Sequence, residues 1–500
     1  MQRKPTGTFA AAVSLAFVSD EREPREDDKP RSDRIPKGRI RRSVKLGSAL
    51  GTQATRYAGT KTANVARSSE RGEERLEARH IETALKLAST LGEMKGAAMK
   101  LGQLASFVDT EFLPEEYREL YQEQLAKLRS SAEAMPWSKV VKVLEEEYDP
   151  ERIDELFEDI EEEAFAAASI GQVHRATLPD GRRVAVKIQY PGVAEALEAD
   201  LRNMGTIVRL AKAIAPGLDP KAIANELRER VLEELDYEFE AQNQRDFARA
   251  YRDHHFIYVP RVISRLSRRR VLVTEYVEGL GFEDVKQLPK PQRDRYGEIV
   301  FRFSFGSIYH LQHFNADAHP GNYVLMADGR VAFLDFGMTK KLDPEQIELE
   351  QRAVDAASRR DPEALREALH DLGFIKNPSK FDAEHLMDHV MVVGGWYLED
   401  REYEVSARRV MKVIESTTDP RSEYYDLMRR ESVPADELMG RRMETGVLAV
   451  LAQLRAKRNW HRIMREYVYA DPPATELGEQ EWEYFEARGE RRTPGIASRT

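Results

Sequence analysis

The residues of this chain with the clearest chemical potential lie near position 320, where oxygen donors recur at a fixed spacing. Asp317 is followed five residues later by Asn322, and Asp335-Phe336-Gly337 follows after a short predicted hairpin. Phosphoryl transfer needs divalent cations beside the phosphates, and such cations prefer carboxylate and amide oxygens. Asn322 and Asp335 are therefore candidate metal ligands. Asp317 lies where the proton of an attacking hydroxyl would be accepted.

A lysine on a predicted strand would complete a protein-kinase-like site. The segment 184–187 is an apolar strand ending in Lys187, which can pair with nucleotide phosphates when a carboxylate on a neighbouring helix holds it. Such a strand is common, so the assignment depends on its place before Asp317 and Asp335. The carboxylate should come from the helix predicted over 220–252. Spacing alone does not choose among its acidic residues, which include Glu233, Glu234, Asp236, Glu238 and Glu240.

The segment expected to meet the nucleotide is rich in alanine. It reads Ala166, Ala167, Ala168 and Ser169, at a place where a protein kinase would have glycines. The Cβ of alanine makes left-handed backbone conformations costly. We therefore expect a stiff loop that meets the phosphates differently. A buried strand of small residues is the structural alternative.

Composition narrows the class of protein. With 500 residues and 41% hydrophobic content, the chain is long enough for two or three structural units. The net charge of -10 argues against a general nucleic-acid binder, and the lack of cysteine excludes disulfides and thiolate metal sites. No apolar run reaches the roughly 18 residues that a membrane span needs.

The N-terminal residues predict a disordered tail rather than an export signal. Residues 9–18 are apolar and follow two basic residues, as in a short signal peptide, but an acidic stretch comes next without a clear cleavage site. Whether the mature chain keeps its first 20 or so residues is left open. Because ATP chemistry belongs inside the cell, we expect a cytoplasmic protein.

The hydrophobic pattern predicts where strands and helices lie. Strands are expected at 165–168, 171–178, 184–189, 259–262 and 270–276, which together would form one five-stranded layer. Helices are expected within 75–148, at 193–213 and at 220–252. From 292 onward the pattern is helical, apart from a hairpin of 323–326 with 331–334.

This order predicts an α+β, protein-kinase-like bilobal fold with an N-terminal helical extension. The expected parts are a disordered tail (1–44), a helical extension (45–155), a small sheet-containing lobe (156–279), a large helical lobe (280–420) and a C-terminal helical extension with a frayed tail (421–500).

Taken together, the residues resemble the UbiB/AarF family of atypical kinase-like proteins, over about residues 85–345. The matching positions, in the order of the family's motifs, are Lys100, Gly102 and Gln103 (KxGQ), Ala166 to Ser169 (alanine-rich loop), Lys187 (strand lysine), Glu234 and Asp236 (ExD), Glu240 (partner of the lysine), Asp317 and Asn322 (catalytic loop) and Asp335 (metal-binding aspartate).

The resemblance implies more than the spacing does. It implies a KxGQ helix that folds over the active site, contacts the ExD segment and blocks the groove where a protein kinase binds its peptide. Lys100, with Gln103 beside it, would latch this cover through a charge pair with Glu234 or Asp236. It also implies ATP or ADP with Mg²⁺ as cofactors, and a link to isoprenoid-quinone biosynthesis or lipid homeostasis.

The chain departs from the family pattern in the catalytic loop. Ala318 replaces a proline, and Asn315 stands where histidine is more common. Farther on, the amphipathic segment 447–469 could lie on a membrane or pack against the large lobe.

These observations give three hypotheses. The first is an atypical kinase or ATPase that acts on, or remodels, a small lipidic molecule. The second is a non-enzymatic, nucleotide-binding scaffold for a biosynthetic complex. The third is an ordinary protein kinase, which the sequence after Gly337 disfavours because it lacks a long activation loop and an Ala-Pro-Glu anchor. A nucleic-acid partner is not expected. Peripheral contact with the inner face of a membrane, and homodimerisation, are left open.

Overall fold

The structure is a computed structural model that describes residues 135–168, 170–195, 233, 235–418, 422–431 and 434–489. Met135–Gln189 and Ile207–Thr500 form one unit, whereas Tyr190–Thr206 group with Met1–Ala134 in another. The helices and strands between Trp137 and Gln189 and between Tyr237 and Ala487 lie in the first of these units.

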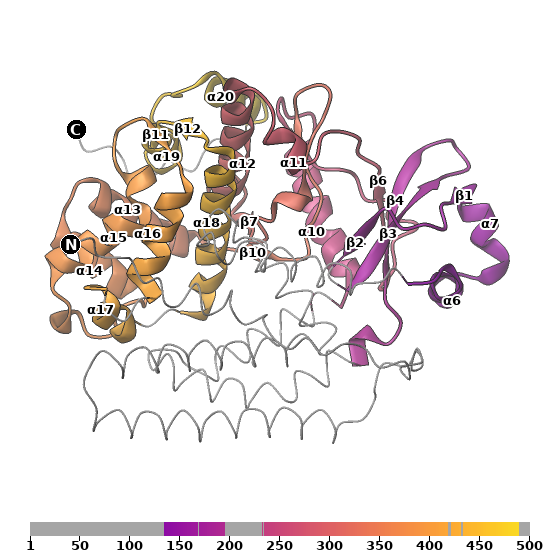
Figure 1. The fold of residues 1–500 in the computed structure, drawn as a ribbon, viewed down its shortest axis with the longest axis horizontal. Coiled ribbons are helices and arrows are strands. Elements are labelled where there is room, and N and C mark those ends of the chain that lie inside the picture. Colours follow the sequence, from indigo (N-terminus) through magenta and orange to yellow (C-terminus); the bar gives the residue numbers. More distant parts are fainter. Residues whose placement is uncertain are drawn as a thin grey trace, which may run out of the picture. The chain divides into compact units, whose positions relative to one another are not determined.

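A five-stranded antiparallel sheet forms the small lobe (Figure 1). Its strands follow the order β1-β3-β4-β6, and β2 also pairs with β3. The turn between β3 and β4 is tight because Gly181 adopts a φ of 81°, which glycine accepts without strain. The bounds are β1 (Asp159–Ile160), β2 (Ala166–Ala168), β3 (Gly171–Thr177), β4 (Arg183–Gln189) and β6 (Val271–Glu275).

The prediction of a five-stranded layer is confirmed, but one of the five predicted strands, 259–262, is wrong. The segment 259–262 contributes only an isolated bridge from Val262 to Thr274, and the place of the fifth strand is taken by β1. Pro260 has no N–H to donate to a ladder, which keeps this segment from forming a strand. The preceding residues, β5 (Ile257–Tyr258), instead pair with β9 in a separate three-stranded sheet.

The helix α6 (Trp137–Glu147), which precedes the sheet, packs against it. The short segments η3 (Pro150–Arg152) and α7 (Ile153–Leu156) follow α6 in the chain. Gln172 in β3 accepts a hydrogen bond from the Met135 backbone N–H at 2.7 Å, and Arg270 forms an ion pair with Glu147 at 2.5 Å. The described residues from Met135 to α6, which were predicted as part of the helical extension, therefore belong structurally with the small lobe.

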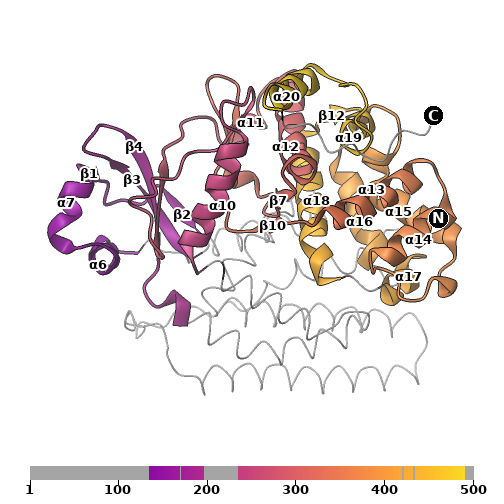
Figure 2. The same cartoon turned by 180° about the vertical axis from the view of Figure 1, so that it is seen from behind.

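The helix predicted over 220–252 is interrupted. In the described part of this region, α10 (Tyr237–Ala250) begins only after Asp236, whose backbone is extended and whose side chain accepts a hydrogen bond from the Glu238 N–H at 2.9 Å. Aspartate favours this N-cap conformation over the helix interior, so it starts a new helix here. In both views, α10 lies between the sheet and the helical body (Figure 1, Figure 2).

The predicted hairpin is present at the edge of the large lobe. Strands β8 (Tyr323–Leu325) and β9 (Val331–Phe333) pair in antiparallel fashion around Gly329, which has a φ of 84°. Just beside it, β7 (His313–Asn315) pairs with β10 (Thr339–Lys341), so both sides of the catalytic region are held by strand pairing.

Helices make up most of the large lobe. The central one, α12, is buried along most of its length, and its Phe303 stacks on Phe333 of β9 with ring centroids 3.6 Å apart. The bounds are α11 (Phe282–Val285), α12 (Lys290–Leu311), η4 (Pro320–Asn322), α13 (Pro344–Ser358), α14 (Pro362–Asp371), η5 (Pro378–Lys380), α15 (Ala383–Leu398), β11 (Tyr403–Glu404), α16 (Ala407–Thr418), α17 (Tyr425–Arg430), α18 (Ala435–Leu454), β12 (Lys457–Arg458), α19 (Trp460–Val468) and α20 (Glu476–Ala487).

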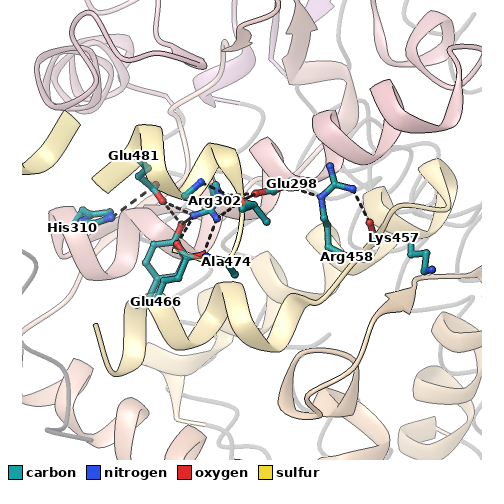
Figure 3. Close-up of polar contacts among 11 residues, drawn as sticks. Glu298, Arg302, His310, Lys457, Arg458, Glu466, Ala474 and Glu481 are labelled. Atoms are coloured by element: carbon teal, nitrogen blue, oxygen red, sulfur yellow. Dashed lines mark hydrogen bonds and ion pairs between the residues drawn. The ribbon is translucent and has the colours of Figure 1, made fainter. Parts of the chain in front are cut away.

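A buried charge cluster attaches the last two helices to α12 (Figure 3). The guanidinium of Arg302 is fully buried and donates to Glu298 at 2.9 Å, to Glu466 at 2.9 Å and to Glu481 at 2.8 Å. The three carboxylates come from α12, α19 and α20. Burial alone would lower the pKa of Arg302, but Tyr467, Glu481 and Glu466 hold it well above its usual range.

The amphipathic segment 447–469 packs within the large lobe. Its apolar residues Val447, Leu448, Leu451 and Leu454 are all less than 4% exposed. The large-lobe alternative is therefore the one that the structure adopts. Within the described residues, no helix is both long enough and apolar enough to span a bilayer.

Candidate active site

The strand lysine and a helix carboxylate meet in the small lobe. Lys187 Nζ, at the buried end of β4, lies 2.8 Å and 2.9 Å from the two carboxylate oxygens of Glu240 in α10. The ring of Tyr237 lies beneath the same ammonium, 5.0 Å from its centroid. Among the described acidic residues that spacing left open, Glu240 is the one observed beside the lysine, and Glu234 lies outside the described residues.

The same lysine reaches the Asp-Phe-Gly segment. Lys187 Nζ lies 3.3 Å from Asp335 Oδ2, while Asp335 Oδ1 accepts a hydrogen bond from the Gly337 N–H at 3.0 Å. The Asp335 side chain is 31% exposed, so it remains accessible to solvent. One ammonium thus faces two carboxylates from different elements.

Burial and charge shift the pKa values of this pair. Burial alone would lower the pKa of Lys187, but the carboxylates of Asp335 and Glu240 raise it well above its usual range. Burial raises the pKa of Glu240 to about 7, against the opposing influence of Lys187. The lysine therefore remains a cation at every physiological pH, and Glu240 is the group of the pair that can titrate.

The catalytic loop is cross-linked to the Asp-Phe-Gly segment by Asn315. Its side-chain oxygen accepts from the Asp317 N–H at 2.9 Å, and its amide nitrogen donates to the Asp335 carbonyl at 2.6 Å. This gives a structural role to Asn315, one of the two residues that depart from the family pattern. The Leu334 N–H also donates to the Asn322 carbonyl at 3.0 Å. The two loops are thus held at a fixed separation.

The predicted metal ligands and the predicted base lie together. Asn322 Nδ2 donates to Asp317 Oδ2 at 3.2 Å, which leaves the amide oxygen as the atom of Asn322 suited to a cation. With Asp335, this gives a carboxylate and an amide oxygen from two loops, beside the Lys187 ammonium. Mg²⁺ typically uses one or two protein oxygens together with phosphate oxygens and water. The residues present therefore fit a magnesium nucleotide.

The alanine-rich segment forms an edge strand. Residues Ala166 to Ala168 make up β2 and pair with β3, with Ala166 and Ala167 exposed. The alternative of a buried strand is therefore wrong. Gly171 opens β3, and a Cβ there would lie 2.2 Å from the Ile188 carbonyl oxygen, so only glycine fits. Ser169 lies outside the described residues.

Most of the predicted latch also lies outside the described residues, namely Lys100, Gln103 and Glu234. Asp236 is described, and its side chain caps α10, the helix that carries Glu240. The ExD aspartate therefore sets where the helix with the lysine's partner begins. A pairing of Lys100 with this segment stays a prediction.

Two residues of the site had no signal in the sequence. Asn243, one turn beyond Glu240 in α10, donates to the Phe336 carbonyl at 3.2 Å. Arg442, in α18, donates from Nη2 to Asp317 Oδ1 at 3.0 Å. Arg442 and Asp317 are 125 residues apart, and no local spacing relates them.

Comparisons with known proteins agree with this geometry. Residues 127–369 match the ABC1 atypical kinase-like domain. The chain is 28% identical to "Atypical kinase coq-8, mitochondrial" of Caenorhabditis elegans, over 77% of this chain and 51% of that protein, so it spans about half the length of that relative. It is 28% identical to "Atypical kinase COQ8B, mitochondrial" of Rattus norvegicus, over 78% of this chain and 74% of that one.

A solved structure is similar over almost its whole length. The Rv3197–erythromycin complex from Mycobacterium tuberculosis is 33% identical, with a TM-score of 0.57, and the match covers 79% of this chain and 98% of that chain. The motifs, the bilobal fold and these matches agree with one another, so the chain belongs to the ABC1 atypical kinase-like family, the UbiB/AarF family that its motifs indicated.

Proposed function

We propose that this chain is an ATP-dependent atypical kinase or ATPase that acts on, or remodels, a small lipidic molecule. One observation carries the proposal: Lys187 Nζ is held by Glu240 at 2.8 Å and also reaches Asp335 at 3.3 Å. This is the arrangement that phosphoryl transfer requires, because a cation must meet the phosphates beside a metal-binding carboxylate.

Each residue of the site has a separate task. Lys187 binds the phosphates, and Glu240 keeps the lysine directed toward them. Asp335 and Asn322 would hold Mg²⁺, which neutralises phosphate charge when bound. Asp317 accepts the hydrogen bond of the attacking hydroxyl or water. That oxygen bonds to the terminal phosphorus as the bond to the bridging oxygen breaks, ADP leaves, and the proton passes through Asp317 to solvent.

The names of several matching proteins support an atypical kinase activity. The mycobacterial protein was solved with erythromycin, so that relative binds a small molecule. The resemblance to the UbiB/AarF family adds a link to isoprenoid-quinone biosynthesis or lipid homeostasis. A cytoplasmic location with peripheral contact to a membrane belongs to the same proposal.

An ordinary protein kinase is less well supported. After Gly337 the chain enters β10 (Thr339–Lys341) and then α13 (Pro344–Ser358) directly, so it has no long segment there on which a peptide could dock. A nucleotide-binding scaffold remains the second candidate. ATP hydrolysis measured with and without detergent or phenolic additives separates them, since a scaffold binds nucleotide but shows no turnover under any condition.

The proposal is tested by Asp335→Asn. An amide is a far poorer ligand for Mg²⁺ than a carboxylate, so we expect at least a hundredfold loss of ATP turnover, on the order of 3 kcal/mol of transition-state stabilisation. Asp328→Asn is the matched control, because Asp328 lies in the β8–β9 turn and pairs with Arg330. Wild-type turnover in purified Asp335→Asn would refute the metal assignment.

Nucleotide preference is measured separately by thermal shift. Stabilisation follows RT ln(1 + [L]/Kd), so titrating ATP and ADP, each with and without Mg²⁺, ranks the ligands directly. We expect Mg²⁺ to increase the shift for ATP in the wild type and to add little in Asp335→Asn.

A further inference from the structure

Helix α18, which precedes the last two helices, reaches the catalytic loop through one arginine. Arg442 Nη2 donates to Asp317 Oδ1 at 3.0 Å. Both side chains are largely shielded from water, since Arg442 is 27% exposed and Asp317 is 14% exposed. A charge-assisted hydrogen bond in such a place is stronger than an ion pair on the open surface.

The backbone of α18 comes close to the loop because two small residues face each other. A Cβ added at Gly446 would lie only 2.8 Å from the Cβ of Ala318, the residue directly after Asp317. Ala318 is 3% exposed, and the next residues of α18, Val447 and Leu448, are buried as well. Gly446 lies one turn after Arg442, so both residues are on the same helix face. The helix therefore packs closely against the loop at the position from which Arg442 reaches it.

The contact leaves Asp317 held on both sides. Oδ1 accepts from Arg442, and Oδ2 accepts from Asn322 Nδ2 at 3.2 Å. The Asp317 N–H is bound by Asn315 as well. A carboxylate oxygen has two acceptor positions, so each Asp317 oxygen retains one for an incoming hydroxyl. Asp317 cannot turn to another rotamer without breaking these bonds.

We propose that Arg442 is a positioning residue for phosphoryl transfer: it fixes the Asp317 carboxylate in the orientation that accepts the hydrogen bond of the attacking hydroxyl or water. This inference rests on the proposed function. Through Arg442, a helix of the predicted C-terminal extension becomes part of the active site. Misplacing a catalytic group by about 1 Å can cost on the order of a hundredfold in rate, so the geometry of this contact matters for turnover.

The alternative is that the ion pair of Arg442 with Asp317 only attaches α18 to the loop and has no role in turnover. The neighbouring residue, Arg441, provides the matched control. Arg441 lies on the same helix but pairs with Glu431 at 3.3 Å and stacks on the ring of Phe374, away from Asp317. Removing Arg441 tests the contribution of α18 packing without touching the catalytic loop.

The experiment compares Arg442→Ala, Arg442→Lys, Arg441→Ala, Asp317→Asn and the double variant Asp317→Asn with Arg442→Ala. For each full-length protein, kcat and KM for ATP turnover and the thermal shift with Mg²⁺ and ATP are measured. We expect Arg442→Ala to lower kcat by roughly tenfold to a hundredfold with KM within about twofold of wild type. Arg442→Lys should recover part of the loss, and Arg441→Ala should turn over normally.

The double variant distinguishes positioning from packing. If Arg442 acts through Asp317, the double variant should be no slower than Asp317→Asn alone. The inference is overturned if Arg442→Ala keeps kcat within about twofold of wild type, or if the two losses multiply in the double variant. If the Arg442→Ala protein does not fold, the same tests move to Arg442→Met, which keeps much of the side-chain volume but has no donor, and undiminished kcat in that variant overturns the inference. If the wild-type protein shows no ATP turnover, the proposed function and this inference are both overturned. If Asp335→Asn loses turnover but Arg442→Ala does not, the proposed function stands and only this inference is overturned.

Discussion

At the scale of single residues, the site depends on one cation shared between two carboxylates. Lys187 Nζ is 2.8 Å from Glu240 and 3.3 Å from Asp335. These three groups together carry more negative than positive charge. A polyphosphate is also negative, so its binding is favourable only when Mg²⁺ supplies further positive charge beside Asp335. The expected coupling between nucleotide and metal follows from this charge balance.

The pH dependence of turnover should report Glu240. Its pKa is raised from an ordinary value of 4.5 to about 7, mainly by burial. Below about pH 7 the carboxylate takes up a proton and no longer directs Lys187, so kcat/KM for ATP should fall by up to about tenfold per pH unit. The measurement is a pH–rate profile between pH 5 and 9.

Glu240→Gln is the control for that assignment, because it keeps the shape of the side chain but cannot ionise. We expect this variant to be slow at every pH and to lose the acid limb centred near pH 7. A wild-type acid limb centred near 4.5, the usual carboxylate value, would contradict the assignment.

At the scale of elements, the attachment of α19 and α20 depends on a buried arginine. Arg302→Met would leave Glu298, Glu466 and Glu481 as three buried carboxylates without their shared cation. We expect a loss of about 3–5 kcal/mol in the free energy of unfolding, because removing the shared partner of buried charges is costly. Urea unfolding followed by tryptophan fluorescence measures it.

Arg462→Met, in α19, is the control. Arg462 pairs with Asp400 at 3.0 Å, but both side chains are more than half exposed. Exposed pairs of this kind contribute at most about 1 kcal/mol. Equal losses for the two variants would mean that burial of the Arg302 cluster does not determine its contribution.

At the scale of the whole molecule, buried histidines should make the fold sensitive to acid. Burial lowers the pKa of His254 to about 3 and those of His313 and His389 to about 4, from an ordinary value of 6.5. Between about pH 4 and 6.5 the unfolded chain therefore binds more protons at these sites than the folded chain does. The contribution of these histidines to the free energy of unfolding is fully present above pH 6.5. It is lost as the pH falls, by up to roughly 1.4 kcal/mol per histidine and pH unit.

The measurement is the melting temperature at pH 5 and pH 7, at constant ionic strength. His389→Phe, which keeps a ring beside Tyr424, removes one titrating group, so its difference between the two pH values should be smaller than that of wild type. An unchanged difference would mean that His389 does not contribute to the acid sensitivity.

Much of the molecule could be predicted from short stretches of sequence. The Asp180-Gly181 and Asp328-Gly329 turns fix two hairpins, because only glycine adopts their positive φ values at low cost. The bilobal fold and the family follow from the order of the motifs. Each of these features is encoded by residues close together in the chain.

The tertiary structure decided what depends on distant partners. It placed Glu240 beside Lys187, a pairing that spacing left open and only the family resemblance implied, started α10 at Asp236, and gave the place of the fifth strand to β1 instead of 259–262. It also brought Arg442 to Asp317 across 125 residues. Turn and strand propensities act over a few residues, so spacing reveals them. The pairing of buried charges that lie far apart in the chain depends on how whole helices pack against each other. No local sequence pattern predicts such pairs.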